Sequence, residues 1–88
     1  MNTQTDDEKS ILTNALPSGE ILLMRTDQTG DFVRSGVVNY IDPNDPSRQA
    51  CGIDALERLK RKGLVRHEAG QLYKLTGAGF QRAKESAP

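Results

Sequence analysis

The chain is poor in the residues with which small domains strengthen a core. Its 88 residues include one cysteine, no tryptophan, two phenylalanines and two tyrosines. A single cysteine, Cys51, cannot form a disulfide within the chain, and this usage is typical of a reducing compartment. Apolar residues make up 35% of the chain and charged residues 27%. Because the apolar residues come in blocks, these fractions indicate one small folded domain with a core of Leu, Ile and Val.

Long hydrophobic runs are also missing. The longest covers residues 21–24, whereas a membrane span needs roughly 18–20 apolar residues. The first ten residues, MNTQTDDEKS, are acidic, whereas the start of a secretory leader is basic. We therefore expect a cytoplasmic protein.

The charges balance but are unevenly distributed. The net charge is zero, yet residues 1–45 carry eight acidic and three basic side chains, and residues 46–88 carry nine basic and four acidic ones. Such an asymmetry can indicate a basic binding face, a dipolar solvated surface or a head-to-tail contact between copies. A neutral chain is a poor candidate for strong non-specific binding to nucleic acid, which depends on neutralising phosphates. A DNA-binding role therefore requires the basic residues to gather on one surface.

The first half of the chain predicts one helix followed by strands. Residues 6–16 have apolar positions at helical spacing, with Asp6 or Asp7 as the cap. A short apolar run at residues 20–26 predicts a buried strand, and residues 27–31 predict a turn. Residues 32–41 predict a strand or a small hairpin. Two prolines make residues 42–46 a stiff loop.

A long helix is predicted next. Asp45 fits the N-cap, and Gly63 fits a left-handed C-cap. The apolar stripe expected to face the core is formed by Ala50, Ile53, Leu56 and Leu59. Gly52 interrupts the pattern, so a break there, with a second helix capped by Asp54, is an alternative. We favour the single helix because the second piece would be barely two turns long.

The second half ends in a hairpin and a helix. Strands are predicted at residues 64–66 and 72–75, with a turn at residues 67–71 between them. Thr76 can cap a last helix whose Phe80 and Ala83 face inward. We expect Tyr73 and Leu75 to belong to the core. Phe32 and Tyr40 would form an apolar contact site if the first hairpin carries them outward.

Residues 55–84 resemble the second half of a winged-helix domain. An amphipathic helix, ALERLKRK, is followed by GLV, a short turn, the strand LYKLT and the helix start GAGFQRAKE. The first half is similar to small bacterial winged-helix modules in which a strand, a hairpin and a DP loop lead directly into one long helix. The resemblance implies an α+β, winged-helix-like fold with three helices, a small antiparallel sheet and a C-terminal wing hairpin. The single domain is expected over residues 6–86, after a disordered tail at residues 1–5.

The resemblance also implies candidate DNA contacts. In a DNA-reading winged helix, the exposed helix face enters the major groove and the wing touches the backbone or the minor groove. Arginine suits bidentate contacts to guanine or phosphate. The candidates are Arg48, Arg58, Arg61, Lys62, Arg66, His67, Gln71 and Lys74. The competing interpretation is a solvated helix end, because basic residues also stabilise the last turn of a helix.

Two functions follow from these observations. The first is a DNA-binding or transcription-regulating module whose partner is double-stranded DNA. The second is a protein-interaction or oligomerisation module that binds a protein partner or a second copy and no nucleic acid. We favour DNA binding, because the basic residues collect where the long helix and the wing lie. The chain has no CxxC, HExxH or paired-acid motif, so we expect no enzyme activity, metal or cofactor.

Overall fold

The computed structural model describes residues 5–25, 30–41 and 44–86, which form three helices and five strands. In chain order these are α1 (Asp6–Ala15), β1 (Glu20–Met24), β2 (Phe32–Ser35), β3 (Val38–Tyr40), α2 (Pro46–Arg61), β4 (Val65–Ala69), β5 (Leu72–Leu75) and α3 (Gly77–Ser86). The predicted α+β class with three helices and an antiparallel sheet is confirmed. Parts of three predicted segments lie outside the described residues: the tail at residues 1–4, the turn at residues 27–29 and the loop at residues 42–43.

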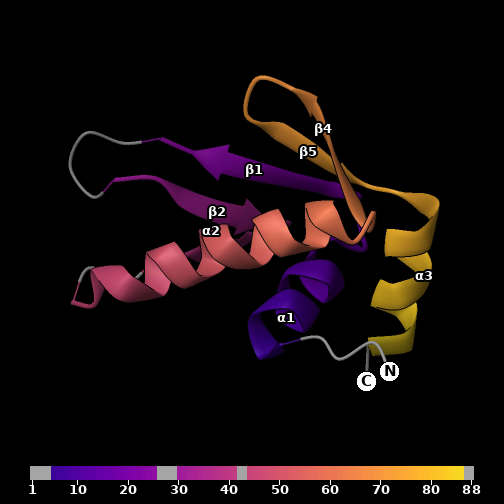
Figure 1. The fold of residues 1–88 in the computed structure, drawn as a ribbon, viewed down its shortest axis with the longest axis horizontal. Helices are drawn as coiled ribbons and strands as arrows, with labels where there is room; N and C mark the ends of the chain where they lie inside the picture. Colours follow the sequence, from indigo (N-terminus) through magenta and orange to yellow (C-terminus); the bar gives the residue numbers. More distant parts are fainter. Residues whose placement is uncertain (1–4, 26–29, 42–43, 87–88) are drawn as a thin grey trace.

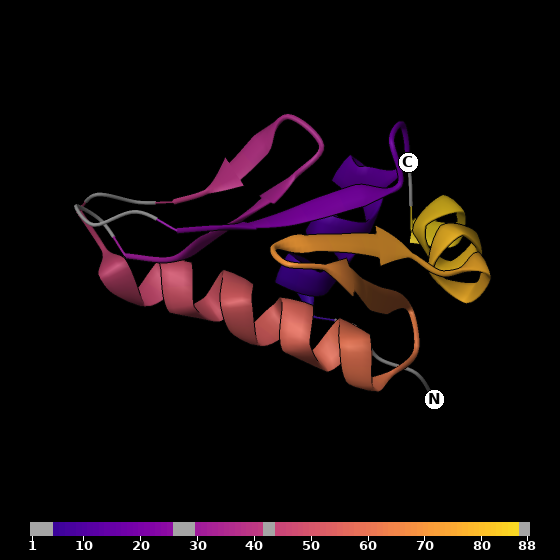
Figure 2. The same ribbon diagram turned by 90° about the horizontal axis from the view of Figure 1, so that it is seen from above.

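One antiparallel sheet holds all five strands, in the order β3-β2-β1-β5-β4. The central strand β1 places Ile21 opposite Ser35 of β2 and opposite Tyr73 of β5. Helices α1 and α2 lie against one face of the sheet, and α3 lies at its end (Figures 1 and 2). None of the described helices covers the other face. The strand order makes β3 and β4 the two edges of the sheet.

The core lies between the sheet and the helices. Alternate strand residues face the helices, as expected for an antiparallel sheet with one packed face. Among them Ile21 and Val33 are fully buried and pack in one cluster with Leu12 of α1 and Leu56 of α2. Tyr73 and Leu75 belong to the same cluster, and Ala83 and Phe80 of α3 pack in or against it, as predicted.

Helix α2 is a single helix. The Asp45 side chain accepts a hydrogen bond from the Ser47 backbone N–H at 3.2 Å and thereby caps the helix. Beyond the helix end Gly63 has a φ of 77°, a left-handed conformation that favours glycine. Both predicted ends are confirmed, and the predicted alternative of a break at Gly52 is wrong.

The structure explains why a glycine stands inside α2. Gly52 is buried, and a Cβ atom there would lie 3.3 Å from the Cβ of Tyr40. Alanine would favour the helix by about 1 kcal/mol, but it would crowd the β2–β3 hairpin. Gly52 therefore lets Tyr40 of β3 pack closely on the helix.

The predicted core stripe of α2 is wrong at one position. Ala50 is exposed, whereas Ala55, which the stripe omitted, is fully buried. The buried side of α2 also includes Gln49, which is 5% exposed. A stripe with a strict spacing of three residues drifts around an α-helix of 3.6 residues per turn. The true stripe therefore leaves the predicted one at the N-terminal end.

Other boundaries also differ from the predictions, and two of these differences bear on the candidate surfaces. The cap of α1 is Thr5, whose hydroxyl accepts from the Glu8 backbone N–H at 3.2 Å, and not Asp6 or Asp7. Strand β4 continues to Ala69, so residues 67–69 belong to the strand and the turn is shorter than predicted. The first change matters for the candidate site because it fixes the position of Glu8.

Candidate binding surfaces

The eight candidate DNA-binding residues lie at separate places. Arg48 is in the first turn of α2, whereas Arg58 and Arg61 are in its last turns. Ten residues separate Arg48 from Arg58 in the helix, a rise of about 15 Å. Lys62 is the C-cap of α2. The remaining four candidates, Arg66, His67, Gln71 and Lys74, belong to the β4–β5 hairpin.

Glu8 of α1 holds two of these candidates. Its carboxylate accepts hydrogen bonds from Arg58 Nε at 3.0 Å and from Lys62 Nζ at 2.7 Å. The Glu8 side chain is 1% exposed, whereas those of Arg58 and Lys62 are 36% and 32% exposed. The Thr5 hydroxyl lies 3.3 Å from the same carboxylate. Arg58 and Lys62 therefore join α2 to α1 as well as facing solvent.

The ion pairs determine the charge state of Glu8. Burial by itself would raise the pKa of the Glu8 carboxyl, because it disfavours the charged form. The hydrogen bonds from Lys62 and Arg58 outweigh burial, and the pKa lies below the usual range of a glutamate. Glu8 is thus a carboxylate at neutral pH, and it neutralises part of the basic charge at the end of α2.

Glu8 is not among the candidates predicted from the sequence, although a signal for it is present. The residues Thr5 and Glu8 form a T-x-x-E pattern, which is typical of a capping box at a helix start. The assignment of Thr5 to a disordered tail hid this pattern. Its engagement with residues 50 and 54 positions further along the chain has no local signal.

The side chains of the β4–β5 hairpin are also engaged. Arg66 Nε lies 3.1 Å from the carboxylate of Glu68. The exposed His67 has its Nε2 2.6 Å from the Gly70 carbonyl oxygen, and its ring centroid lies 4.8 Å from that of Tyr73. His67 is therefore ordered against its own hairpin.

Three of the basic residues at the C-terminal end of α2 and on the β4–β5 hairpin have no carboxylate within ion-pair distance among the described residues. Lys60 and Arg61 are exposed at the end of α2, and Lys74 is half-buried on β5. Lys74 lies beside Arg66 of β4 and beside Glu20 of β1 in the strand register. Lys60 is not among the candidates predicted from the sequence.

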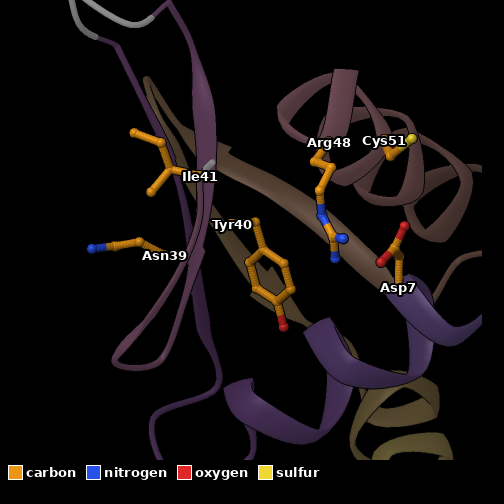
Figure 3. Close-up of a pocket in the computed structure, with 6 residues that line it drawn as sticks. All are labelled: Asp7, Asn39, Tyr40, Ile41, Arg48 and Cys51. Carbon is orange, nitrogen blue, oxygen red and sulfur yellow. The ribbon is translucent and has the colours of Figure 1, made fainter. Parts of the chain in front are cut away.

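A pocket of about 370 Å³ lies beside β3, where the first turns of α1 and α2 approach the strand. Figure 3 shows the Arg48 guanidinium pointing toward Tyr40 and Asp7. Cys51 also lines the pocket and is exposed. The pocket walls thus carry both charges and the aromatic ring of Tyr40.

The β2–β3 hairpin carries an apolar edge. Val37 is 88% exposed and Val38 is 37% exposed, and these are the only exposed large hydrophobic residues in the described segments. The hairpin does not carry its aromatic residues outward: Phe32 is 8% exposed, and Tyr40 packs against the core. The exposed apolar surface of the hairpin is therefore made by its valines.

The hairpin is fixed to α1 by polar contacts. The Tyr40 hydroxyl is 2.6 Å from Ser10 Oγ and accepts from Asn14 Nδ2 at 2.9 Å. The fully buried Ser35 donates to the Ile11 carbonyl oxygen at 2.5 Å. These bonds hold both strands of the hairpin in place, so its edge is preformed.

The described residues contain no group of three or more His, Cys, Asp and Glu side chains placed to hold a metal ion. In the same part of the chain, no helix has the length and apolar character that crossing a bilayer requires. The fold and its surfaces define a small α+β domain with a five-stranded antiparallel sheet. Comparison of the chain with protein-family models, with curated proteins and with solved structures finds no match.

Proposed function

We propose that this domain is a protein-interaction module that binds its partner through the outer edge of β3. The observation that carries the proposal is the position of Val37 and Val38. Both of the exposed large hydrophobic residues in the described segments lie on this edge or on the turn beside it. Contiguous exposed apolar residues are typical of protein-binding surfaces.

The two edges of the sheet differ in how they are protected. The β4 edge, Val65–Ala69, carries charged side chains, Arg66 and Glu68. Charges on an edge strand oppose pairing with another chain. Residues 37–41, Val-Val-Asn-Tyr-Ile, carry no charge. The β3 edge therefore offers unpaired backbone groups without charged side chains to protect them, as in domains that bind an extended segment as an added strand.

The polar contacts to α1 support the same function. A preformed edge loses little conformational freedom on binding, which favours affinity. The hydrogen bonds of Tyr40 to Ser10 and Asn14 supply this rigidity. The winged-helix-like character of the scaffold belongs to the proposal as well. It is supported by the order of α2 and the β4–β5 hairpin, and by the pairing of β5 with β1.

The test is selection of short peptides from a displayed random library against the full chain, followed by binding measurements on two variants. Asn39→Pro removes a backbone N–H from the edge, and Glu68→Lys changes the opposite edge. We expect selected peptides to lose at least tenfold in affinity with Asn39→Pro and to bind Glu68→Lys as they bind the wild type. Peptides that bind both variants equally, or no selected peptides at all, would contradict the proposal.

DNA binding through α2 and the β4–β5 hairpin is a second candidate. It is favoured by Lys60 and Arg61, which are exposed and have no carboxylate partner among the described residues. It is weakened by Glu8, which neutralises charge on Arg58 and Lys62. A titration with random duplex DNA separates the candidates. Salt-sensitive binding that is lost in Lys60→Ala/Arg61→Ala would favour DNA, and the absence of binding at low salt would exclude it.

A further inference from the structure

We infer that the partner at the β3 edge is β3 of a second copy, paired antiparallel about a two-fold axis at Asn39. This inference rests on the proposed function of the edge. It is carried by three features of the hairpin: the direction of its backbone groups, the side chains that such pairing brings together, and the open space beyond the strand.

The turn of the hairpin determines which backbone groups face outward. Ser35 pairs with Val38 across the two-residue turn of Gly36 and Val37. Gly36 has a φ of 60°, as the first position of a type II′ turn requires. The pair that closes such a turn is hydrogen-bonded, and hydrogen-bonded and non-hydrogen-bonded pairs alternate along an antiparallel ladder.

The direction of the backbone groups of Asn39 follows from this alternation. Its pair with Arg34 is non-hydrogen-bonded, so the N–H and C=O groups of Asn39 point away from β2 and toward the open edge. A two-fold axis at Asn39 pairs Asn39 with itself in the second copy and places Val37 opposite Ile41. The Asn39 pair then uses the outward-facing backbone groups of both copies.

The same register gives complementary side chains. Val37, the most exposed large hydrophobic residue of the described segments, is opposite Ile41, and Val38 is opposite Tyr40. Figure 3 shows that the side chains of Asn39 and Ile41 leave the strand on the side away from Tyr40. One face of the new ladder therefore holds Val37, Asn39 and Ile41 of both copies, and the other face holds Val38 and Tyr40. The paired segment brings no two like charges together, because residues 37–41 are uncharged. Cross-strand pairs of β-branched and aromatic residues stabilise a sheet.

There is room for a second strand. In Figure 2 none of the described helices lies beyond the outer edge of β3. The pocket lined by Tyr40 and Arg48 opens beside this strand on the face that Tyr40 occupies. Val38 of the second copy, opposite Tyr40, would lie at the mouth of that pocket. Pairing would thus join two five-stranded sheets and cover the exposed valines.

The first experiment is sedimentation of the full chain at rising concentration. A contact of one short strand buries little surface, so we expect a weak dimer, with the mass rising from 9.7 kDa toward twice that value between about 10 µM and about 1 mM. Val37→Lys places charges in the contact and is expected to keep the chain monomeric. The control, Gln81→Lys, adds the same charge on the exposed side of α3 and should dimerise like the wild type.

The second experiment tests the register by cross-linking. A hydrogen-bonded antiparallel pair places its Cα atoms about 5.5 Å apart, within the range of a disulfide. Cys51→Ser/Asn39→Cys should therefore form a disulfide-linked dimer on mild oxidation. Cys51→Ser/Arg66→Cys, on the charged β4 edge, should not.

The outcomes separate this inference from the proposed function. A chain that stays monomeric to about 1 mM, or a dimer that Val37→Lys leaves intact, overturns pairing with a second copy. If selected peptides still bind the β3 edge in that case, the interaction module stands and its partner is another protein. If the chain dimerises through Asn39 and no peptide binds, recognition of other proteins at this edge is overturned and the edge serves self-association alone.

Discussion

Replacing Glu8 by glutamine is the sharpest test of how the two halves of the chain are held together. The glutamine side chain keeps the size of the glutamate but loses its charge. Glu8 is 1% exposed and accepts two charge-assisted hydrogen bonds. Hydrogen bonds to charged groups contribute about 1.5–3 kcal/mol each. Arg58 and Lys62 are about one third exposed and regain water when released, so we expect a total loss of about 2–3 kcal/mol.

The assay is thermal unfolding followed by circular dichroism at several pH values. For a domain of this size, 1 kcal/mol shifts the midpoint by about 4–8 °C, so Glu8→Gln should lower Tm by roughly 8–24 °C at pH 7. The folded-state pKa of Glu8 lies below its ordinary value. Its stabilisation is therefore complete above the ordinary glutamate pKa of about 4.3, and it is lost as the pH falls through the lower folded-state pKa. The difference in Tm between wild type and Glu8→Gln should shrink over that acidic range.

Glu57→Gln is the matched control, because Glu57 is an exposed carboxylate on α2 without an ion pair among the described residues. This substitution should change the free energy of unfolding by no more than about 0.5 kcal/mol. The reasoning is refuted if Glu8→Gln unfolds at the same temperature as Glu57→Gln. It is also refuted if the deficit of Glu8→Gln remains unchanged at a pH low enough to protonate Glu8.

Three further predictions concern other contacts of the fold and its surfaces. Tyr40→Phe removes the hydroxyl that contacts Ser10 and Asn14 and should destabilise the domain by about 1–2 kcal/mol in urea unfolding. A smaller loss of stability for the same change in a Ser10→Ala background would show that Tyr40 and Ser10 are coupled, and equal losses would contradict that coupling. Gly79→Ala would drive a Cβ into the Leu64 carbonyl oxygen, whereas a Cβ at Gly77 meets nothing within 4 Å. Gly79→Ala should therefore lower the free energy of unfolding by more than about 2 kcal/mol, and Gly77→Ala should be neutral or stabilising by up to about 1 kcal/mol. Similar unfolding midpoints for the two variants would contradict this packing. Glu8→Gln should also raise any affinity for duplex DNA severalfold at low salt, because it leaves the charges of Arg58 and Lys62 unpaired. Unchanged DNA binding in a fluorescence anisotropy titration would remove those two residues from the DNA-binding candidates.

The sequence predicted the parts of the fold that depend on local chemistry. Asp45 and Gly63 define the ends of α2 through their own side chain and backbone conformations, and both positions are confirmed. Gly52 indicated a possible break in the helix, whereas the structure explains the glycine by the close approach of Tyr40 from a different element. Contacts of this kind depend on tertiary packing and leave no mark in a local pattern.

The candidate surfaces were harder to predict for the same reason. Counting basic residues indicated a positive helix end, but Glu8 pairs with Arg58 from 50 positions away. The sequence left open whether the hairpin carries Phe32 and Tyr40 outward, and the hydroxyl of Tyr40 turns toward α1. The valines beside them are the exposed residues, since the edge position of β3 follows from the strand order and not from the hairpin sequence.

Amide hydrogen exchange at Asn39 tests the central claim most directly. Its N–H faces the open edge in a single copy and is hydrogen-bonded across the two-fold axis in the pair. Exchange at Asn39 should therefore slow severalfold as the protein concentration rises, while amides of the α3 segment, which lies away from β3, keep constant rates (Figure 2). An Asn39 amide that exchanges at the same rate in dilute and concentrated samples would contradict pairing at the β3 edge.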